Sequence, residues 1–343
     1  MADNRKKYAD LYKGIAITLV VIGHTPCISN ELVRVIYSFH MPAFFFIYGL
    51  MYQFEKHRSK GFVTKNFIID KVKRLLIPCW IWGVFYMLCN LKLSFRGVAG
   101  IIYGSQAGFI YANSLSSLWF LPCMFVAVVC FEIIIQKSDK IFNKRLLFVI
   151  LFCVFAAVAW MLPHFKYGYP FGIDSSMIAV IFIILSYLLQ PLVNKRVDRG
   201  LITMDYVIAV LLLCILLLTY RINLRFVPIN NVDLAKRYLG NIVLYLLDAF
   251  SGCIALLYIC IFLSKYEWII INYVVFLGRV SLIIMIIHKP IVIHLSELLK
   301  YISLYNSIGG IIASLLTIAV CSVLSFVLDK YTPFLFGKYI KRI

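Results

Sequence analysis

The chain has 343 residues, of which 63% are apolar and 14% are charged, and its mean hydropathy is +0.92. So few charged residues exclude a soluble surface and indicate a membrane protein with several spans. A helix that crosses about 30 Å of hydrocarbon needs about 20 mostly apolar residues. The apolar runs are long and unbroken, which excludes the short alternating segments of a β-barrel.

The formal net charge of +19 would fit nucleic-acid binding, so its distribution along the chain matters more than its sum. With the N-terminus in the cytoplasm, most Lys and Arg residues fall in segments on the cytoplasmic side, as the positive-inside rule requires. We therefore expect no nucleic-acid partner. The ten cysteines are scattered through apolar segments without C-x-x-C pairs or histidine clusters, which predicts buried thiols and no metal site.

The hydropathy pattern predicts an all-α, polytopic helical bundle of about ten transmembrane helices, with the N- and C-termini both cytoplasmic. No internal repeat or linker is visible, so we expect one domain over residues 1–343. The predicted spans, in chain order, are 11–29, 34–53, 72–91, 115–136, 146–162, 175–192, 201–220, 239–263, 275–295 and 306–328.

The first span carries two polar groups, Lys13 and His24, eleven residues apart in "YKGIAITLVVIGHTP". Eleven residues make about three helical turns and about 16 Å, which puts both groups on nearly the same face. An ionisable side chain at the bilayer centre costs roughly 3 kcal/mol, so it is a functional hypothesis by default. Asp10 precedes Lys13 by three residues and is expected to pair with it. The alternative for Lys13 is an anchor whose ammonium reaches the interface.

Histidine is suited to proton transfer at this depth, because its unperturbed pKa near 6.5 lets it act as a base at neutral pH. His24 is the first candidate. His40, in "SFHMPAFFFIYG", and His288, in "GRVSLIIMIIHKP", also lie in apolar runs. The alternative for each is a buried histidine that only hydrogen-bonds a neighbouring helix.

A second basic pair, Lys71 and Arg74, lies in "DKVKRLLIPCW" at the start of the third span. Residues three apart share one face of an α-helix, and fixed cations at a cytosolic helix end suit phosphate groups. The alternative is ordinary positive-inside flanking. Two carboxylates, Glu132 and Asp248, also lie near or within spans, and the sequence assigns them no role.

Five blocks in order resemble the acyltransferase family 3, the bacterial integral-membrane O-acyltransferases, over almost the whole chain. The most specific is a basic residue, ten residues and a histidine, here Lys13 to His24. The others are "SFHMPAFFFIYG", the pair Lys71 and Arg74, "SSLWFLPCMF" and "FLGRVSLIIMIIHKPIV". Two departures are lysine in place of the commoner arginine at both basic positions, and Tyr48 where the family usually has a small serine.

The resemblance implies transfer of an acyl group, usually acetyl, from cytosolic acetyl-CoA to a sugar hydroxyl at or beyond the other face of the membrane. Acetyl-CoA would be a donor substrate, with no permanently bound cofactor. The implied location is the bacterial inner membrane. The implied partners are acyl-CoA, membrane lipids and a glycan or lipid-linked saccharide acceptor.

The implied roles follow the matched residues. His24 would be the general base, and Lys13, Lys71 and Arg74 would hold the phosphates of the coenzyme. Asp10, His40, Ser117, Trp119 and His288 would support the site or line the acceptor side, although Trp119 would equally fit an aromatic belt at the membrane surface.

The competing function is a secondary transporter of a small solute or lipid-linked sugar. Transporters often show related halves, and the two halves of this chain share no visible pattern. Acyl transfer by the purified protein indicates the enzyme, whereas substrate-coupled flux without acyl transfer indicates the carrier.

Overall fold

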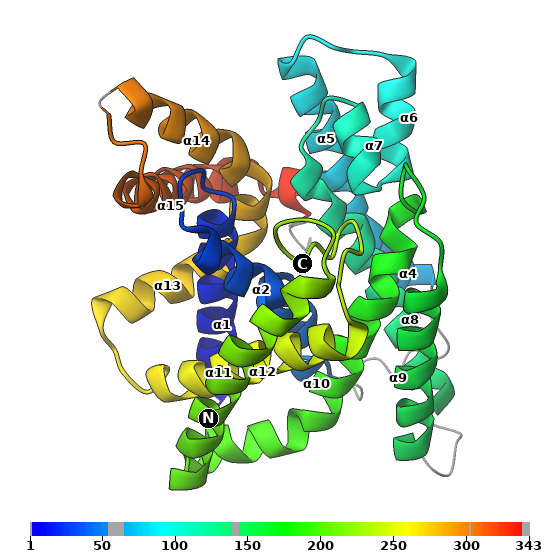
Figure 1. Ribbon diagram of the computed structural model, residues 1–343, viewed down its shortest axis with the longest axis vertical. Helices are drawn as coiled ribbons and strands as arrows, with labels where there is room; N and C mark the ends of the chain where they lie inside the picture. The colour runs from blue at the N-terminus through cyan, green and yellow to red at the C-terminus, as the bar shows by residue number, and fades with distance from the viewer. Residues whose placement is uncertain (1, 54–64, 139–143, 302, 338–343) are drawn as a thin grey trace. The chain divides into compact units, whose positions relative to one another are not determined.

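The computed structural model describes residues 2–53, 65–138, 144–301 and 303–337 (Figure 1). Every regular element in these ranges is a helix, and their strand-like pairing is limited to an isolated bridge between Asp233 and Tyr238. The prediction of an all-α polytopic protein is confirmed.

The structure forms two compact units, each built from segments that are discontinuous in sequence. The first unit comprises Met1–Met51, Leu188–Leu234 and Tyr238–Asp329, and the second comprises Tyr52–Tyr187, Ala235–Arg237 and Lys330–Ile343. One domain over residues 1–343 stays a prediction.

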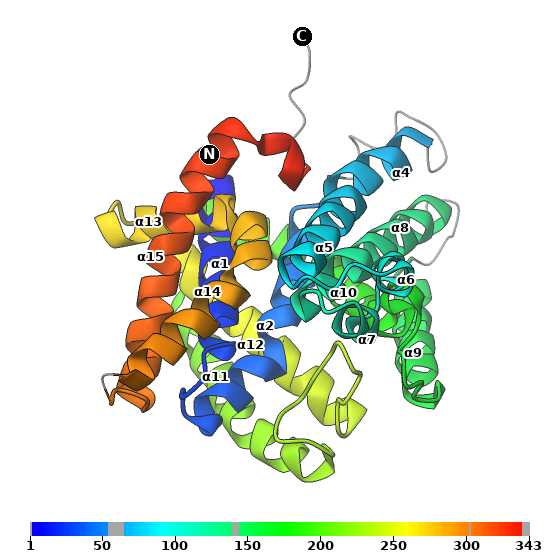
Figure 2. The same cartoon turned by 90° about the horizontal axis from the view of Figure 1, so that it is seen from above.

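The first unit is organised around the N-terminal helix. In this unit α1 packs against α13, α2, α12 and α14, and α12 packs against α11 and α2. Figures 1 and 2 show α1 in dark blue, with α14 on one side of it and α15 beside α14. The helices are α1 (Ala2–Gly23), α2 (Asn30–Leu50), the end of α10 (Ile173–Arg199), α11 (Thr203–Asn223), η4 (Leu224–Phe226), α12 (Ile242–Leu263), α13 (Ile269–Arg279), α14 (Ser281–Tyr301) and α15 (Ser307–Tyr331).

The second unit contains shorter helices and the first part of α10. A π-helical segment, η1, follows α4 and packs against α8, and the final helix η5 packs against α5. The elements are α4 (Lys65–Lys71), η1 (Val72–Leu76), α5 (Ile77–Cys89), α6 (Phe95–Tyr103), α7 (Gln106–Tyr111), η2 (Ser116–Trp119), α8 (Phe120–Ser138), α9 (Lys144–Met161), η3 (Pro170–Gly172) and η5 (Pro333–Phe336).

Side-chain caps fix where several of these helices begin. The Ser29 hydroxyl accepts a hydrogen bond from the Leu32 N–H at the start of α2, and the Asn241 side chain accepts from Val243 and Leu244 at the start of α12. Such caps satisfy backbone N–H groups that have no partner within the helix. Short polar residues between apolar runs therefore mark the ends of the helices.

Eight helices in the described part of the chain are long and apolar enough to cross a membrane. They correspond to eight of the ten predicted spans, and the other two predicted spans differ for physical reasons. The helix α1 begins at Ala2, and its first half is charged, so its apolar part is short. The apolar part of α9, Leu146–Met161, is also shorter than a typical span.

One predicted span is misplaced. The interval 275–295 was expected to be a single helix, but α13 ends at Arg279 and α14 begins at Ser281. Hydropathy does not detect this break, because apolar residues continue on both sides of it. The spanning helix is therefore Ser281–Tyr301.

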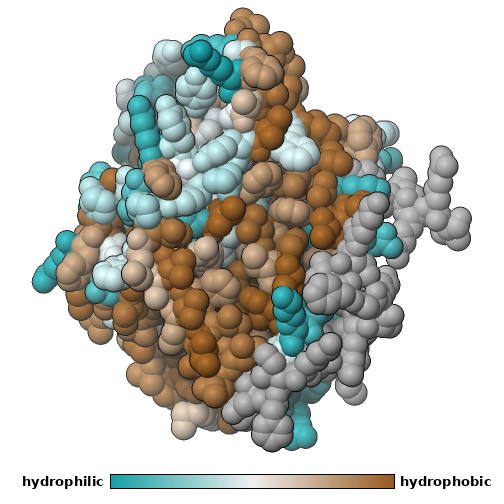
Figure 3. Space-filling view, turned by 90° about the vertical axis from the view of Figure 1, so that its right-hand side faces the viewer, coloured by the Kyte–Doolittle hydropathy of each residue, from teal (hydrophilic) through white to brown (hydrophobic). Residues whose placement is uncertain are grey.

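The helix surfaces are hydrophobic where lipid would cover them. In α9, the exposed side chains include Leu146, Val149, Ile150 and Trp160. Figure 3 shows hydrophobic side chains, in brown, over much of one face of the molecule. Exposed apolar surface on this scale fits a protein whose surroundings are hydrocarbon.

Candidate functional site

His24 follows the last residue of α1, at the end of the apolar helix. Its Nδ1 lies 2.9 Å from the carbonyl oxygen of Val20. A carbonyl oxygen only accepts hydrogen bonds, so Nδ1 must carry the proton that is donated. In the neutral ring this leaves Nε2 of His24 unprotonated and able to accept a proton.

His40 and His288 repeat this arrangement. Nδ1 of His40 lies 2.8 Å from the carbonyl oxygen of Ile36, and Nδ1 of His288 lies 2.9 Å from that of Ile284. Both side chains are buried. Nε2 of His288 has no hydrogen-bond partner among the described residues. A buried acceptor without a partner is costly and calls for an explanation.

The three histidines come together in the first unit, from the residue after α1 and from α2 and α14. The ring centroids of His24 and His288 are 5.2 Å apart, with the rings edge to face. Tyr37 connects the third histidine, because its ring centroid lies 6.1 Å from that of His24 and 4.8 Å from that of His40. The fold therefore gathers His24, His40 and His288 into one cluster and adds Tyr37, which the sequence analysis missed.

Asp10 links Lys13 to a second cation in the same unit. The Lys13 ammonium lies 2.7 Å from Oδ1 of Asp10, so the predicted pairing is confirmed. The guanidinium Nε of Arg279 donates to Oδ2 of the same carboxylate at 3.2 Å. Arg279 could have been found as a charged residue inside an apolar run, but its partner Asp10 is far away in the chain.

Close backbone approach between α1 and α13 brings these charges together. A Cβ atom added to Gly278 would lie 1.8 Å from the carbonyl oxygen of Asp10, and one added to Gly14 would lie 1.9 Å from that of Val274. These distances are too short for a side chain. The two glycines therefore allow the contact that places Arg279 beside Asp10.

A second ion pair joins α1 to the segment before α13, outside the predicted spans. The Lys7 ammonium lies 2.6 Å from a carboxylate oxygen of Glu267, and it holds the pKa of Glu267 below its ordinary value. The Glu267 side chain is 78% exposed. This pair is a helix-linking contact on the surface.

Lys71 and Arg74 belong to the second unit, where each has a neighbour on its own helix. The Lys71 ammonium lies over the Phe67 ring, 5.1 Å from its centroid. Nε of Arg74 donates to Asp70 at 2.8 Å, and both of these side chains are about half exposed. Lys71 ends α4 and Arg74 lies in the π-helical segment, so the expected α-helical i,i+3 spacing does not hold there.

Ser117 and Trp119 lie in η2 of the second unit, and both are buried. Trp119 is 8% exposed, which places it inside the unit and not in an aromatic belt at the lipid-facing surface. The Ser117 hydroxyl has no hydrogen-bond partner among the described residues. The described contacts do not connect these two residues to the histidine cluster.

The two carboxylates without a role are also buried. Glu132 accepts hydrogen bonds from the Tyr52 hydroxyl at 2.8 Å and from the Gln136 amide at 2.7 Å, in the second unit. Asp248 accepts from the Thr219 hydroxyl in the first unit, and its Oδ2 has no partner among the described residues.

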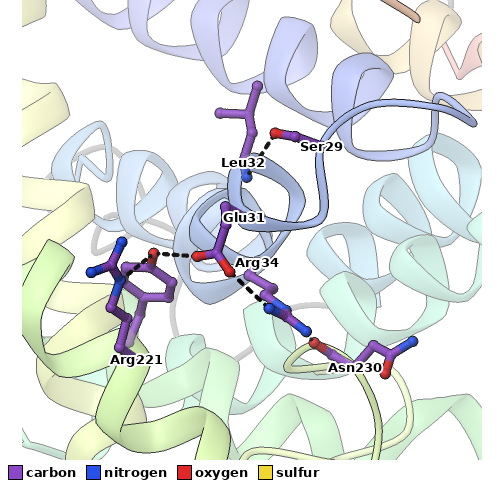
Figure 4. Close-up of polar contacts among 7 residues, drawn as sticks. Ser29, Glu31, Leu32, Arg34, Arg221 and Asn230 are labelled. Atoms are coloured by element: carbon purple, nitrogen blue, oxygen red, sulfur yellow. Dashed lines mark hydrogen bonds and ion pairs between the residues drawn. The ribbon is translucent and has the colours of Figure 1, made fainter. Parts of the chain in front are cut away.

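The polar side chains at the start of α2 form a cluster in which they bond to one another and to the nearby backbone (Figure 4). Glu31 accepts from the Tyr220 hydroxyl at 2.8 Å and pairs with Arg34 at 2.9 Å. Arg34 also donates to the backbone of Asn230, and Arg221 donates to Tyr220. The cluster joins α2 to the end of α11 and the following loop, and its carboxylate is fully engaged.

Comparison with known proteins agrees with the resemblance read from the sequence. A family model described as an acyltransferase domain matches residues 6–326, nearly the whole chain. No curated protein and no solved structure matches the chain in the corresponding searches. Among the described residues, no group of three or more His, Cys, Asp or Glu side chains could hold a metal ion.

Proposed function

Because this chain belongs to the acyltransferase family 3 and is a multi-pass membrane acyltransferase, we propose that it is an O-acetyltransferase with His24 as general base. The donor is cytosolic acetyl-CoA, and the acceptor is a sugar hydroxyl of a bacterial surface or exported glycan, such as capsule, O-antigen or exopolysaccharide. The protein works in the bacterial inner membrane.

The observation that carries this proposal is the fixed tautomer of His24. The Val20 carbonyl holds the proton on Nδ1 and leaves Nε2 as the acceptor. A base must accept the hydroxyl proton as the oxygen attacks, so a ring held in this tautomer needs no rearrangement before reaction. The neighbouring His288 presents a buried Nε2 that is also unprotonated when neutral.

The reaction balances with these groups alone. Nε2 of His24 takes the proton from the acceptor hydroxyl while its oxygen forms a bond to the thioester carbonyl carbon. The carbon–sulfur bond then breaks, and the coenzyme leaves as a thiolate that takes the proton back from His24. A thiolate is a better leaving group than a sugar alkoxide, because thiols are far more acidic than alcohols, so the tetrahedral intermediate collapses to the ester.

General-base assistance of this kind is typically worth 10²- to 10⁴-fold in rate. Tyr37 packs beside the base, and His40 packs against Tyr37. The described histidine cluster contains no serine, threonine or cysteine side chain, which favours direct transfer over an acyl-enzyme.

Lys71 and Arg74 are proposed as contacts to the phosphates of the donor, in addition to Lys13. Arg74 uses only Nε in its described ion pair, and a guanidinium has five N–H donors. The support for this role is their chemistry and the family resemblance.

The purified protein in detergent tests the function directly. Acetyl-CoA and a glycan acceptor are supplied, and release of the free thiol and gain of the acetyl ester are measured for the unchanged protein and for His24→Ala. Transfer that is lost in the variant supports the proposal. Unchanged transfer by His24→Ala would remove His24 from the mechanism, and substrate flux in liposomes without any acyl transfer would identify a carrier.

His294 offers a matched control for that substitution. It lies on α14, its Nδ1 contacts the carbonyl oxygen of Pro290 at 2.7 Å, and its side chain is exposed. His294→Ala removes a histidine with the same local hydrogen bond but outside the cluster, so transfer is expected to continue.

A separate experiment identifies the acceptor polymer. Surface glycans of cells with and without the gene are compared, and the polymer that lacks the acetyl mass in cells without the gene is the acceptor.

A further inference from the structure

We propose that Arg279 is a further donor-binding residue, which together with Lys13 grips a phosphate group of acyl-CoA. This inference rests on the proposed function, because it names a contact of that same donor. The ligand chemistry is a phosphate ester or diphosphate.

The geometry joins the two cations through one carboxylate. The Lys13 ammonium and the Arg279 guanidinium each lie within 3.2 Å of an oxygen of Asp10. Two positive charges share one negative charge, so the group carries a net positive charge. Such a group attracts an anion at its open side.

Arg279 is the member that faces outward. Its side chain is 66% exposed, whereas that of Asp10 is 18% exposed. The described contact uses Nε, and the planar fork of the guanidinium carries four further N–H donors. A fork of this kind fits two phosphate oxygens at once, which a single ammonium cannot do. The Asp10 carboxylate thus holds the guanidinium of Arg279 through Nε, while the other N–H groups can donate to a phosphate.

The position of Arg279 is set by backbone packing between α13 and α1 and does not depend on a flexible loop. Gly278 precedes Arg279 and lies against the backbone of Asp10 and Gly14. A residue next to such a tight contact has little freedom to move its Cα. The Cα of Arg279 at the end of α13 is therefore held at a fixed place near Lys13 of α1.

An ion pair that only joins two helices predicts a different result. Lys7 and Glu267 form such a pair between α1 and the segment before α13. If Arg279 only holds α13 to α1, then Arg279→Gln and Asp10→Asn break the same contact and have the same effect. If Arg279 binds phosphate, Arg279→Gln removes a ligand contact, whereas Asp10→Asn leaves both cations present.

The decisive measurement compares two donors. S-Acetyl-pantetheine carries the reacting thioester but no phosphate. We expect Arg279→Gln to raise the KM for acetyl-CoA about tenfold and to leave that for S-acetyl-pantetheine unchanged. Arg279→Lys should restore part of the loss, and Asp10→Asn should raise the KM for acetyl-CoA less than Arg279→Gln does. Glu267→Gln is the matched control and should leave both values unchanged.

If Arg279→Gln raised the KM for S-acetyl-pantetheine as much as the KM for acetyl-CoA, the proposal would be overturned. A rise in KM from Asp10→Asn as large as that from Arg279→Gln would also overturn it, because a structural ion pair would then suffice.

A binding experiment separates this inference from the proposed function. Adenosine 3′,5′-bisphosphate, the phosphate-bearing end of the coenzyme without its thioester arm, is titrated into the detergent-solubilised protein. Its affinity should fall about tenfold in Arg279→Gln, even if no acyl transfer is found. An affinity that is unchanged in Arg279→Gln contradicts the inference.

A phosphate could also come from a lipid headgroup. The same titration in nanodiscs of phosphatidylcholine, with and without phosphatidylglycerol, distinguishes the two sources. The thermal stability of the protein is measured in both kinds of nanodisc. If Arg279→Gln abolishes the gain in stability from phosphatidylglycerol and leaves bisphosphate binding intact, then Arg279 binds the lipid headgroup and the proposed contact with the donor is wrong.

Discussion

The rings of His24 and His288 lie edge to face with centroids 5.2 Å apart, although 263 residues separate them in the chain. The contact joins the end of α1 to the middle of α14. It places beside the proposed base a histidine whose buried Nε2 has no hydrogen-bond partner in the part of the chain that the structure describes.

The first prediction concerns that unpartnered nitrogen. His288→Phe keeps an aromatic ring against His24 and removes the acceptor, so kcat for acetyl transfer should fall by at least about 10²-fold. His288→Gln keeps a polar group at this position, so its kcat should fall less. Steady-state kinetics measure both, and thermal unfolding in detergent shows that the variants are folded. Full activity in the folded His288→Phe protein would limit His288 to packing.

The second prediction concerns Tyr37, whose ring connects His24 and His40. Tyr37→Phe retains these ring contacts and should keep kcat close to that of the unchanged protein. Tyr37→Ala leaves the base without a neighbour on one side, and kcat should fall about tenfold, a loss of about 1.4 kcal/mol of transition-state stabilisation. If Tyr37→Phe is as slow as Tyr37→Ala, then the hydroxyl has a role of its own.

The third prediction concerns the close contact of α1 and α13. Gly278→Ala puts a methyl group against the backbone oxygen of Asp10, and the strain should lower the free energy of unfolding by about 1–3 kcal/mol. A lower midpoint of thermal unfolding would report it. Gly97→Ala is the comparison, because a Cβ there meets side-chain atoms first, the Met87 sulfur and the Ser94 hydroxyl oxygen, and not a backbone oxygen, so the loss of stability should be smaller.

The fourth prediction concerns the basic pair of the second unit. Lys71→Gln and Arg74→Gln should each raise the KM for acetyl-CoA, because each removes a cation proposed to contact phosphate, with kcat changed less. Lys73→Gln is the control within the same segment, since Lys73 is an exposed cation outside the proposed pair. Should all three variants raise the KM equally, the residues would contribute only general positive charge near the membrane.

The sequence predicted the individual residues of the histidine cluster, but it did not predict that they lie close together in the fold. His24, His40 and His288 were each recognisable as polar groups within apolar runs. Their convergence was not, because contacts between distant helices depend on packing that hydropathy does not encode. Asp10 and Lys13 were predicted as a pair because residues three apart in a helix are neighbours. Arg279 is a charged residue in an apolar run, but the sequence alone could not pair it with Asp10, since the two lie at opposite ends of the chain.

The same limit explains the misplaced helix end. The turn at Val280 interrupts an apolar run, and the residues that mark it are Gly278 and Ser281. Their significance depends on the backbone of α1 that Gly278 touches. The roles of Ser117 and Trp119 stay predictions, because the sequence placed them in a family block but could not give their neighbours.

The π-helical segment Val72–Leu76 has a consequence for the register of the helix that carries it. Such a segment accommodates about one more residue than α-helical winding would over the same length. Deleting one residue between Lys71 and Arg74 would let the stretch Asn66–Cys89 wind as a regular α-helix. The helix on either side would keep its direction, because the wide turn already absorbs the extra residue. The extra residue therefore sets the angular spacing of Lys71 and Arg74 about the helix axis without turning the α-helix before or after the segment.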